Sequence, residues 1–112
     1  MRLAICLLWA SLSLWSVTRK EVVFRETPQG TLKMTIFYPP DWKPADQRPG
    51  IVFFFGGGFV SGEPRQFFSK AAYLSGRGLV AASAEYRIKN KHQTTVEDAL
   101  SDCQAAFAWL KY

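Results

Sequence analysis

The feature that most limits what this chain can fold into is a run of five apolar residues, Ile51 to Phe55, that leads directly into Gly56-Gly57-Gly58. A strand so uniformly apolar is typical of a parallel sheet covered by helices on both faces. Consecutive glycines permit positive φ angles and leave the following turn without side chains. Main-chain N–H groups in such a turn can converge on one point and stabilise negative charge there.

The residues that follow extend this strand into a strand-helix-strand unit. We expect a helix to begin near Pro64, because proline is favoured in a first helical turn, and to stop at Gly76 and Gly78. A second apolar strand is expected over residues 79–84. This spacing is typical of a crossover unit, which joins two parallel strands.

The preceding residues predict an antiparallel hairpin. A β-prone run over residues 21–26 is followed by turn residues at 28–30. From Thr31 to Tyr38 apolar and polar residues alternate, which predicts a half-buried strand whose core face is formed by Leu32, Met34, Ile36 and Tyr38. Residues 39–50 hold four prolines and four charged residues, so we expect an exposed connector there.

The last segment predicts an amphipathic helix. Thr94 and Glu97 have the spacing of a capping box, which marks a helix start. The core-facing stripe is predicted to follow at spacings of 4, 3, 4 and 3, through Val96, Leu100, Cys103, Phe107 and Leu110. The sequence ends inside this helix, and we expect the sheet of such a fold to continue beyond it.

Residues 1–17 resemble the leader of an exported protein. Arg2 is followed by an uncharged run from Leu3 to Val17, which is short for a membrane span of ~20 residues. The run suits a secretory signal peptide with an uncertain cleavage site, and an uncleaved membrane anchor is the alternative. We therefore expect export to a periplasm or beyond, no stable membrane span, and a partial domain over residues 20–112. Because Cys6 lies in the leader, Cys103 has no partner for an internal disulfide.

Charge and glycine spacing argue against nucleic-acid and nucleotide binding. The net charge is +5, and its densest patch, Arg87, Lys89 and Lys91, lacks the interleaved aromatic residues of a single-strand binder. We therefore expect a solvated loop and no nucleic-acid partner. Gly-x-Gly-x-x-Gly fails at Ser61 and no Gly-Lys-Ser/Thr follows a glycine loop, so a nucleotide-phosphate site is the less favoured reading.

From about Thr31 to Tyr112 the chain resembles the N-terminal half of α/β-hydrolases, specifically the esterase and lipase group whose loop after the third strand reads His-Gly-Gly-Gly. The closest resemblance is to exported acetyl-esterase and feruloyl-esterase-like members, in which Phe replaces that His. The matching residues are Phe55-Gly56-Gly57-Gly58-Phe59, Gly62, Tyr86-Arg87, His92, Asp102 and Trp109-Leu110.

The resemblance implies an α/β fold, with an antiparallel hairpin followed by parallel strands and crossover helices. It implies hydrolysis of a small-molecule or polysaccharide-linked carboxylic ester through a serine nucleophile, without metal or organic cofactor. The N–H groups of Gly57 and Gly58 would belong to the oxyanion hole, and Phe59 would line the acyl pocket. Arg87 and Asp102 would form a structural ion pair.

The catalytic triad of that family has no counterpart in the sequence. Ser61 is followed by Gly62 but lacks the first glycine of a Gly-x-Ser-x-Gly elbow, and Ser75 and Ser83 lie in helix and strand patterns. His92, the only histidine, would be solvent-facing and not catalytic. We therefore expect a fold truncated before the nucleophile elbow and a chain that is inactive alone. A non-catalytic exported binding module and a degraded remnant remain as alternatives.

Overall fold

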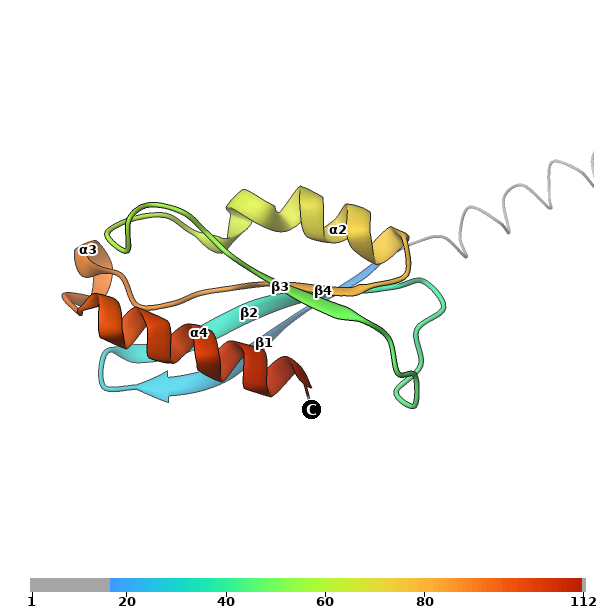
Figure 1. Cartoon of the computed structure of the whole chain (residues 1–112), viewed down its shortest axis with the longest axis horizontal. Coiled ribbons are helices and arrows are strands. Elements are labelled where there is room, and N and C mark those ends of the chain that lie inside the picture. Colours follow the sequence, from blue (N-terminus) through green and yellow to red (C-terminus); the bar gives the residue numbers. More distant parts are fainter. Residues whose placement is uncertain (1–16, 112) are drawn as a thin grey trace, which may run out of the picture.

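The computed structural model describes residues 17–111, so the predicted signal peptide lies outside the described residues except for Val17, and so does Cys6. The chain forms a four-stranded sheet with helices packed on it (Figure 1). Its elements, in chain order, are β1 (Thr18–Thr27), β2 (Gly30–Tyr38), β3 (Gly50–Phe54), the 3-10 helix η1 (Pro64–Phe67), α2 (Phe68–Gly76), β4 (Val80–Ala84), α3 (Lys89–His92) and α4 (Val96–Lys111).

The sheet has the order β1-β2-β4-β3. β1 and β2 pair antiparallel as a hairpin, with an irregularity between Val23 and Arg25, and β4 pairs antiparallel with β2. β3 and β4 pair in parallel through the crossover that contains η1 and α2. The predicted fold class, a hairpin followed by parallel strands with a crossover helix, is therefore confirmed.

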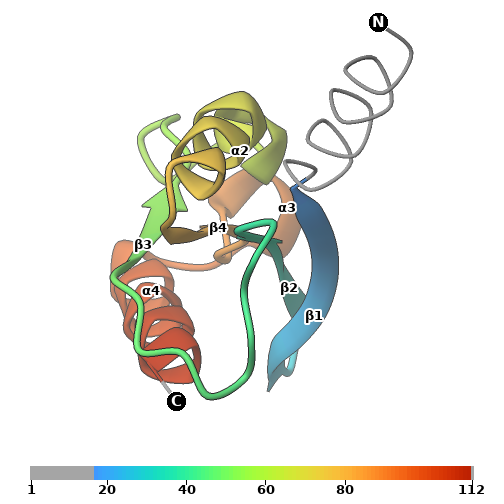
Figure 2. The ribbon, with the colours of Figure 1, turned by 90° about the vertical axis from the view of Figure 1, so that its right-hand side faces the viewer.

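The helices cover opposite faces of this sheet, with α2 on one side and α4 on the other (Figure 2). Because successive strand residues point to opposite faces, each strand contributes to two cores. Leu32, Met34 and Ile36 are buried on the α4 side, as the alternation predicts. Phe37 is buried on the α2 side, so the second half of β2 is covered on both faces rather than one.

β3 is less buried than its sequence predicts. Ile51 to Phe54 are all half-buried, whereas β4 is almost entirely buried. The reason is position, because β3 is the end strand of the sheet among the described residues and pairs only with β4. Along its other edge, the main-chain N–H and C=O groups of β3 pair with no strand among the described residues, and apolar side chains lie beside them.

The core face of α4 is a quarter of a turn away from the predicted stripe, since consecutive residues are ~100° apart in a helix. Ala99, Asp102 and Ala106 are the buried residues of the helix. Three members of the predicted stripe, Val96, Leu100 and Phe107, are 44%, 50% and 60% exposed. Cys103 and Leu110, the other two members, are half-buried and pack against the core, as predicted. The stripe was wrong at Val96, Leu100 and Phe107, because small alanines allow α4 to approach the sheet closely and form the contact instead.

The start of α4 also differs from the prediction by one residue. Thr95 and Asp98 form the capping interaction: the Asp98 N–H donates to Thr95 Oγ1 at 3.3 Å, and the Thr95 N–H donates to Asp98 Oδ2 at 3.1 Å. The hydroxyl of Thr94 is buried without a hydrogen bond. Thr94 and Glu97 are therefore not the capping pair.

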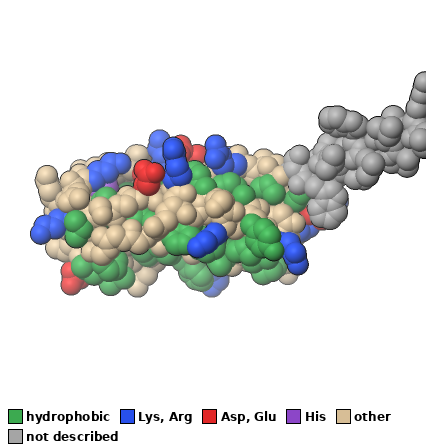
Figure 3. Space-filling model, turned by 90° about the horizontal axis from the view of Figure 1, so that it is seen from above, with side chains coloured by type: hydrophobic (Ala, Val, Ile, Leu, Met, Phe, Trp, Pro, Cys, Tyr) green, Lys and Arg blue, Asp and Glu red, His purple; other side chains and the backbone are tan. Residues whose placement is uncertain are grey.

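Apolar side chains line a groove beside the first residues of β3. This groove of about 1390 Å³ lies between the end of α4, the connector after β2 and the first residues of β3. Seen from above, hydrophobic side chains reach the surface along one long side (Figure 3). Among residues 17–111 no helix has the length and apolar character needed to cross a membrane.

Candidate functional site

The glycine loop, residues 56–62, turns sharply where β3 ends. Gly57 has φ +140°, and Gly58 and Phe59 both have left-handed backbone with φ +64° and +65°. The N–H groups of Val60 and Ser61 both donate to the carbonyl oxygen of Gly57, at 3.1 and 3.3 Å. The loop is thus a tight turn closed on its own main chain.

Close packing explains why two of its residues must be glycine. A Cβ on Gly57 would overlap the carbonyl oxygen of Ser61, and a Cβ on Gly62 would overlap the carbonyl oxygen of Gly56. Gly58 is different, because a Cβ there would meet nothing within 4 Å and only its backbone angle favours glycine.

The main-chain amides of this turn are available to a ligand. Gly56, Gly57 and Gly58 are all exposed. Within residues 17–111, no hydrogen bond uses the N–H of Gly57, Gly58 or Phe59. Exposed, unpaired donors at the carboxyl end of a parallel strand are chemically suited to bind an oxygen anion.

The carbonyl groups of the loop are fixed, in contrast to these amides. The Tyr86 hydroxyl donates to the carbonyl oxygen of Phe55, where β3 has just ended. On the returning side, the Lys89 N–H donates to Phe59 O and the Asn90 N–H to Val60 O, both at 3.1 Å. At the entry, the Gly56 N–H donates to Gln66 Oε1 at 2.8 Å.

Phe59 lies beside the loop against a small core. Its side chain is half-buried and packs on a cluster of Phe55, Tyr86, Ile88 and Ala99. The rings of Phe59 and Tyr86 meet edge to face, with centroids 6.0 Å apart.

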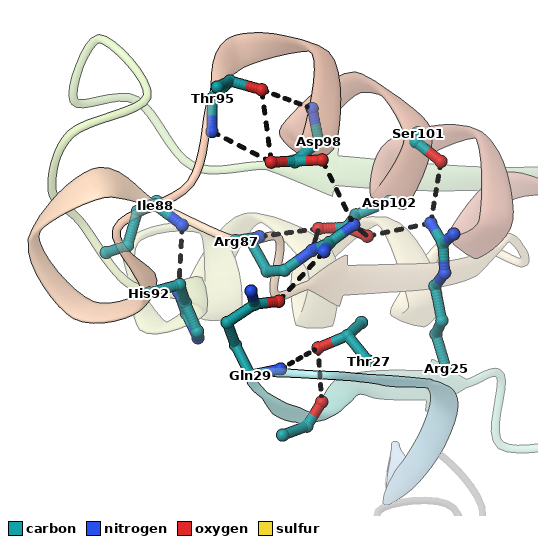
Figure 4. Close-up of polar contacts among 11 residues, drawn as sticks. Arg25, Thr27, Gln29, Arg87, Ile88, His92, Thr95, Asp98, Ser101 and Asp102 are labelled. Carbon is teal, nitrogen blue, oxygen red and sulfur yellow. Dashed lines mark hydrogen bonds and ion pairs between the residues drawn. The ribbon is translucent and has the colours of Figure 1, made fainter.

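The structure brings Arg87 and Asp102 together in a buried cluster (Figure 4). The Asp102 carboxylate is fully buried and accepts from Arg87 Nε at 2.9 Å, Arg87 Nη2 at 3.1 Å and the Arg87 main-chain N–H at 2.9 Å. Arg25 Nη1 of β1 also donates to Asp102 at 2.9 Å. Gln29 accepts from Arg87 Nη1 at 3.1 Å, and the Ser101 hydroxyl accepts from Arg25 at 2.9 Å.

This cluster corrects the predicted basic patch. Arg87 is 7% exposed and neutralised by Asp102, so it does not join Lys89 and Lys91 on the surface. The hydrogen bond that the Arg87 guanidinium donates to Asp102 raises the pKa of Arg87. The positive charges of Arg25 and Arg87 compensate the fully buried carboxylate of Asp102 for its lost hydration.

His92 also differs from its prediction as a solvent-facing loop residue. It ends the short helix α3 and is half-buried. The Nδ1 of His92 accepts a hydrogen bond from the Ile88 N–H at 3.0 Å, and the main-chain N–H of His92 donates to Ile88 O at 2.8 Å. His92 therefore closes the turn over residues 88–92 and lies outside the glycine loop.

Two residues near the site escaped the sequence analysis. Arg25 joins Asp102 across 77 positions of sequence, and Gln66 reaches Gly56 from η1. Tyr86 was part of the family resemblance, but its bond to Phe55 O has no sequence signal.

Burial also affects two weak acids next to the site. Burial raises the pKa of the Tyr86 phenol and raises the pKa of the Cys103 thiol to about 11. Cys103 is a free cysteine. Nowhere in residues 17–111 do three or more His, Cys, Asp or Glu side chains gather as a potential metal site.

Solved structures similar to this chain are esterases. Esterase 2 of Thermogutta terrifontis, a thermophilic esterase from a Planctomycetes species, matches in its butyrate-bound form with a TM-score of 0.79 and 44% identity over 81% of this chain and 33% of that chain. The same esterase phosphorylated by paraoxon matches with a TM-score of 0.80 and 43% identity over 82% of this chain and 35% of that chain. No protein-family model matches the chain, and no curated protein matches it.

The chain spans about a third of the length of these esterases. At this identity and TM-score, the hairpin, the parallel pair and the helices on both faces form part of an α/β-hydrolase fold of the esterase type.

Proposed function

We propose that this chain supplies the oxyanion-hole segment of a serine-type carboxylic-ester hydrolase. The observation that carries the proposal is the glycine loop, where the exposed N–H groups of Gly57 and Gly58 donate no hydrogen bond within the described residues. The similarity to esterase structures supports the same chemistry.

In this proposal the two amides act on the carbonyl oxygen of the ester. When a nucleophile attacks the carbonyl carbon, the oxygen gains negative charge, and N–H donors already aimed at it stabilise the transition state more than the substrate. Gly57 and Gly58 both have positive φ angles, which glycine adopts readily, and in this proposal their N–H groups point at the same oxygen. Phe59, at the edge of the loop, would contact the acyl part of the ester.

The nucleophile and its base would come from polypeptide outside these 112 residues, because no serine in the sequence lies in a Gly-x-Ser-x-Gly elbow. Among the described serines, Ser75 and Ser83 are fully buried, and the Ser83 hydroxyl donates to Pro64 O at 2.7 Å. Without the nucleophile we expect the chain alone to leave p-nitrophenyl acetate unhydrolysed.

A chimaera tests the proposal directly. The matched third of Thermogutta terrifontis esterase 2 is replaced by the corresponding segment of this chain, and hydrolysis of p-nitrophenyl butyrate is measured. We expect an active enzyme. Gly57→Ala keeps its main-chain N–H, but its Cβ would overlap Ser61 O, so the turn must shift and move the oxyanion donors; we expect kcat to fall by about 10²–10³, the effect of losing one such donor. Gly30→Ala is the matched control, because Gly30 also has a positive φ angle, lies outside the glycine loop and a Cβ there would meet nothing within 4 Å.

Titration with paraoxon counts the intact active sites in each chimaera, since that compound phosphorylates the Thermogutta enzyme. Equal kcat for the parent and Gly57→Ala, at equal counts of paraoxon-reactive sites, would refute the oxyanion role. A chimaera that reacts with paraoxon but never turns over the ester would do the same.

We also propose that residues 1–17 direct export of the protein. The proposal rests on the uncharged run after Arg2. Intact mass measurement of the protein expressed from its complete reading frame should show loss of the leader in the exported fraction. Recovery of only unprocessed chain in the cytosol would contradict it.

A further inference from the structure

The feature that needs an explanation is how a turn with unpaired amides keeps one conformation. Glycines are the most flexible residues, so an unsupported triplet would sample many backbone angles and scatter its N–H groups. The described hydrogen bonds provide an answer, because they hold the carbonyl groups at both ends of the turn and leave the N–H groups of Gly57, Gly58 and Phe59 unbonded.

Tyr86 contacts both sides of the turn. Its ring is 4% exposed and stacks on Phe55, with centroids 4.2 Å apart and planes inclined by 14°. The same ring meets Phe59 edge to face. Its hydroxyl donates to the carbonyl oxygen of Phe55, the last residue before the glycines. The carbonyl of Phe55 and the N–H of Gly56 belong to the same planar peptide group. Fixing that carbonyl therefore fixes the orientation of the peptide that leads into Gly57.

The segment after Tyr86 holds the returning side of the turn. The main-chain N–H of Arg87 donates to the buried carboxylate of Asp102 at 2.9 Å, which fixes this segment to α4. Two and three residues later, the amides of Lys89 and Asn90 donate to the carbonyl oxygens of Phe59 and Val60. The buried ion cluster is therefore connected to the glycine loop through main-chain hydrogen bonds.

We propose that Tyr86 is a positioning residue for the oxyanion hole: its hydroxyl and ring hold the entry of the glycine loop, while the segment anchored by Asp102 holds the exit, so that the amides of Gly57 and Gly58 face solvent in a fixed arrangement. This inference rests on the proposed function. A phenol suits the task because it donates one hydrogen bond and brings an apolar ring that packs on both flanks of the loop. Burial raises the pKa of this phenol, which keeps it a donor at neutral and moderately alkaline pH.

The first test uses the full chain and amide hydrogen exchange measured by NMR. Tyr86→Phe removes one oxygen and keeps the ring. We expect the amides of Lys89 and Asn90 to exchange about 10-fold faster in this variant, while the amide of Met34 in β2 keeps its rate, since local opening of a loop leaves the sheet intact. Tyr73→Phe is the matched control, because Tyr73 is 65% exposed on α2.

Unchanged exchange at Lys89 and Asn90 would overturn the inference. Loss of protection at Met34 as well would also overturn it, because Tyr86 would then support the whole fold rather than the placement of the loop.

The second test uses the esterase chimaera described above. Tyr86→Phe should lower kcat for p-nitrophenyl butyrate about 10-fold with KM nearly unchanged, since misplaced amides lose contact with the transition state and not with the bound ester. Unchanged kcat overturns the positioning role if Gly57→Ala still lowers kcat. If Gly57→Ala also leaves kcat unchanged, the proposed oxyanion role is refuted. In that case only the hydrogen-exchange measurement tests whether Tyr86 anchors the loop.

Discussion

The glycine loop and the buried ion cluster treat their polar groups in opposite ways, although main-chain hydrogen bonds connect the two regions. In the loop, exposed main-chain donors of Gly57 and Gly58 have no partner among the described residues. In the cluster, the carboxylate of Asp102 is fully buried and accepts hydrogen bonds from Arg25 and from both the side chain and the main chain of Arg87. An unpaired donor is tolerated where water or a ligand can reach it, whereas an unpaired buried charge is not. The exposed unpaired amides of the loop therefore mark a candidate for function, and the fully paired carboxylate of Asp102 marks structure.

The strongest way to break this comparison is to remove the carboxylate at the centre of the cluster. Asp102→Ala should lower the free energy of unfolding by about 3–5 kcal/mol, because the buried Arg87 guanidinium loses its counter-charge. Urea unfolding followed by circular dichroism measures the loss. Asp98→Asn is the control, since Asp98 lies 4.0 Å from Arg87 and is far more exposed. A loss no larger than that of the control would mean that the cluster is not structural.

A pair of glycine substitutions sharpens the other side of the comparison. Gly62 and Gly30 have nearly equal φ angles of +118° and +124°, but a Cβ at Gly62 would overlap Gly56 O and the Phe55 ring, and a Cβ at Gly30 meets nothing. Both alanine variants carry similar backbone strain, so the difference between their free energies of unfolding measures the effect of steric overlap. We expect Gly62→Ala to be less stable than Gly30→Ala by about 2 kcal/mol in urea unfolding. Equal losses would show that the loop is free to rearrange.

A smaller effect is expected at the start of α4, which carries Asp102. Thr95→Ala removes the hydroxyl that accepts from the Asp98 N–H and should cost about 1 kcal/mol of stability. Thr94→Ala, which removes a hydroxyl without any described partner, should not destabilise the protein. Thermal unfolding of the two variants gives the comparison. A larger loss of stability for Thr94→Ala than for Thr95→Ala would instead support Thr94 and Glu97, the capping pair predicted from the sequence.

The smallest effect on stability is expected at Cys103, which lies next to Asp102 and packs beneath the glycine loop. Burial raises its thiol pKa from 9.0 to about 11, so at pH 8 the reactive thiolate should be about 100-fold rarer than in an unfolded chain. Mass spectrometry of the Cys103 peptide after iodoacetamide treatment measures this protection. Because the folded state favours the protonated thiol, this contribution to stability is complete below pH 9 and is lost as pH rises through about 11. Rapid alkylation at pH 8 would contradict the burial.

Local patterns predicted the elements of this fold well. The alternation of Leu32, Met34 and Ile36 identified β2 and its main core face, and Gly76 and Gly78 marked the end of α2. These signals depend only on neighbours in sequence, so tertiary packing did not need to be known. The glycine triplet likewise predicted a turn with positive φ angles.

The predictions failed where the outcome depends on distant residues. Both Thr94-x-x-Glu97 and Thr95-x-x-Asp98 fit the capping pattern, and only the backbone path into α4 selects the second. The buried face of α4 follows from close approach to the sheet, which the small Ala99 and Ala106 permit and a count of large apolar residues misses. Local sequence gives no signal for the bond of Arg25 to Asp102 across 77 positions.

The strand order has a consequence for how the chain assembles. β4 lies between β2 and β3 and is the last of the four strands to be synthesised. Met34 of β2 pairs with Ala84 of β4 and precedes it by 50 residues. The hairpin can form early from local contacts, but β3 has no neighbour until β4 emerges from the ribosome. During that interval the apolar run at Ile51 is unpaired, which makes it a segment of the nascent domain that a chaperone can bind.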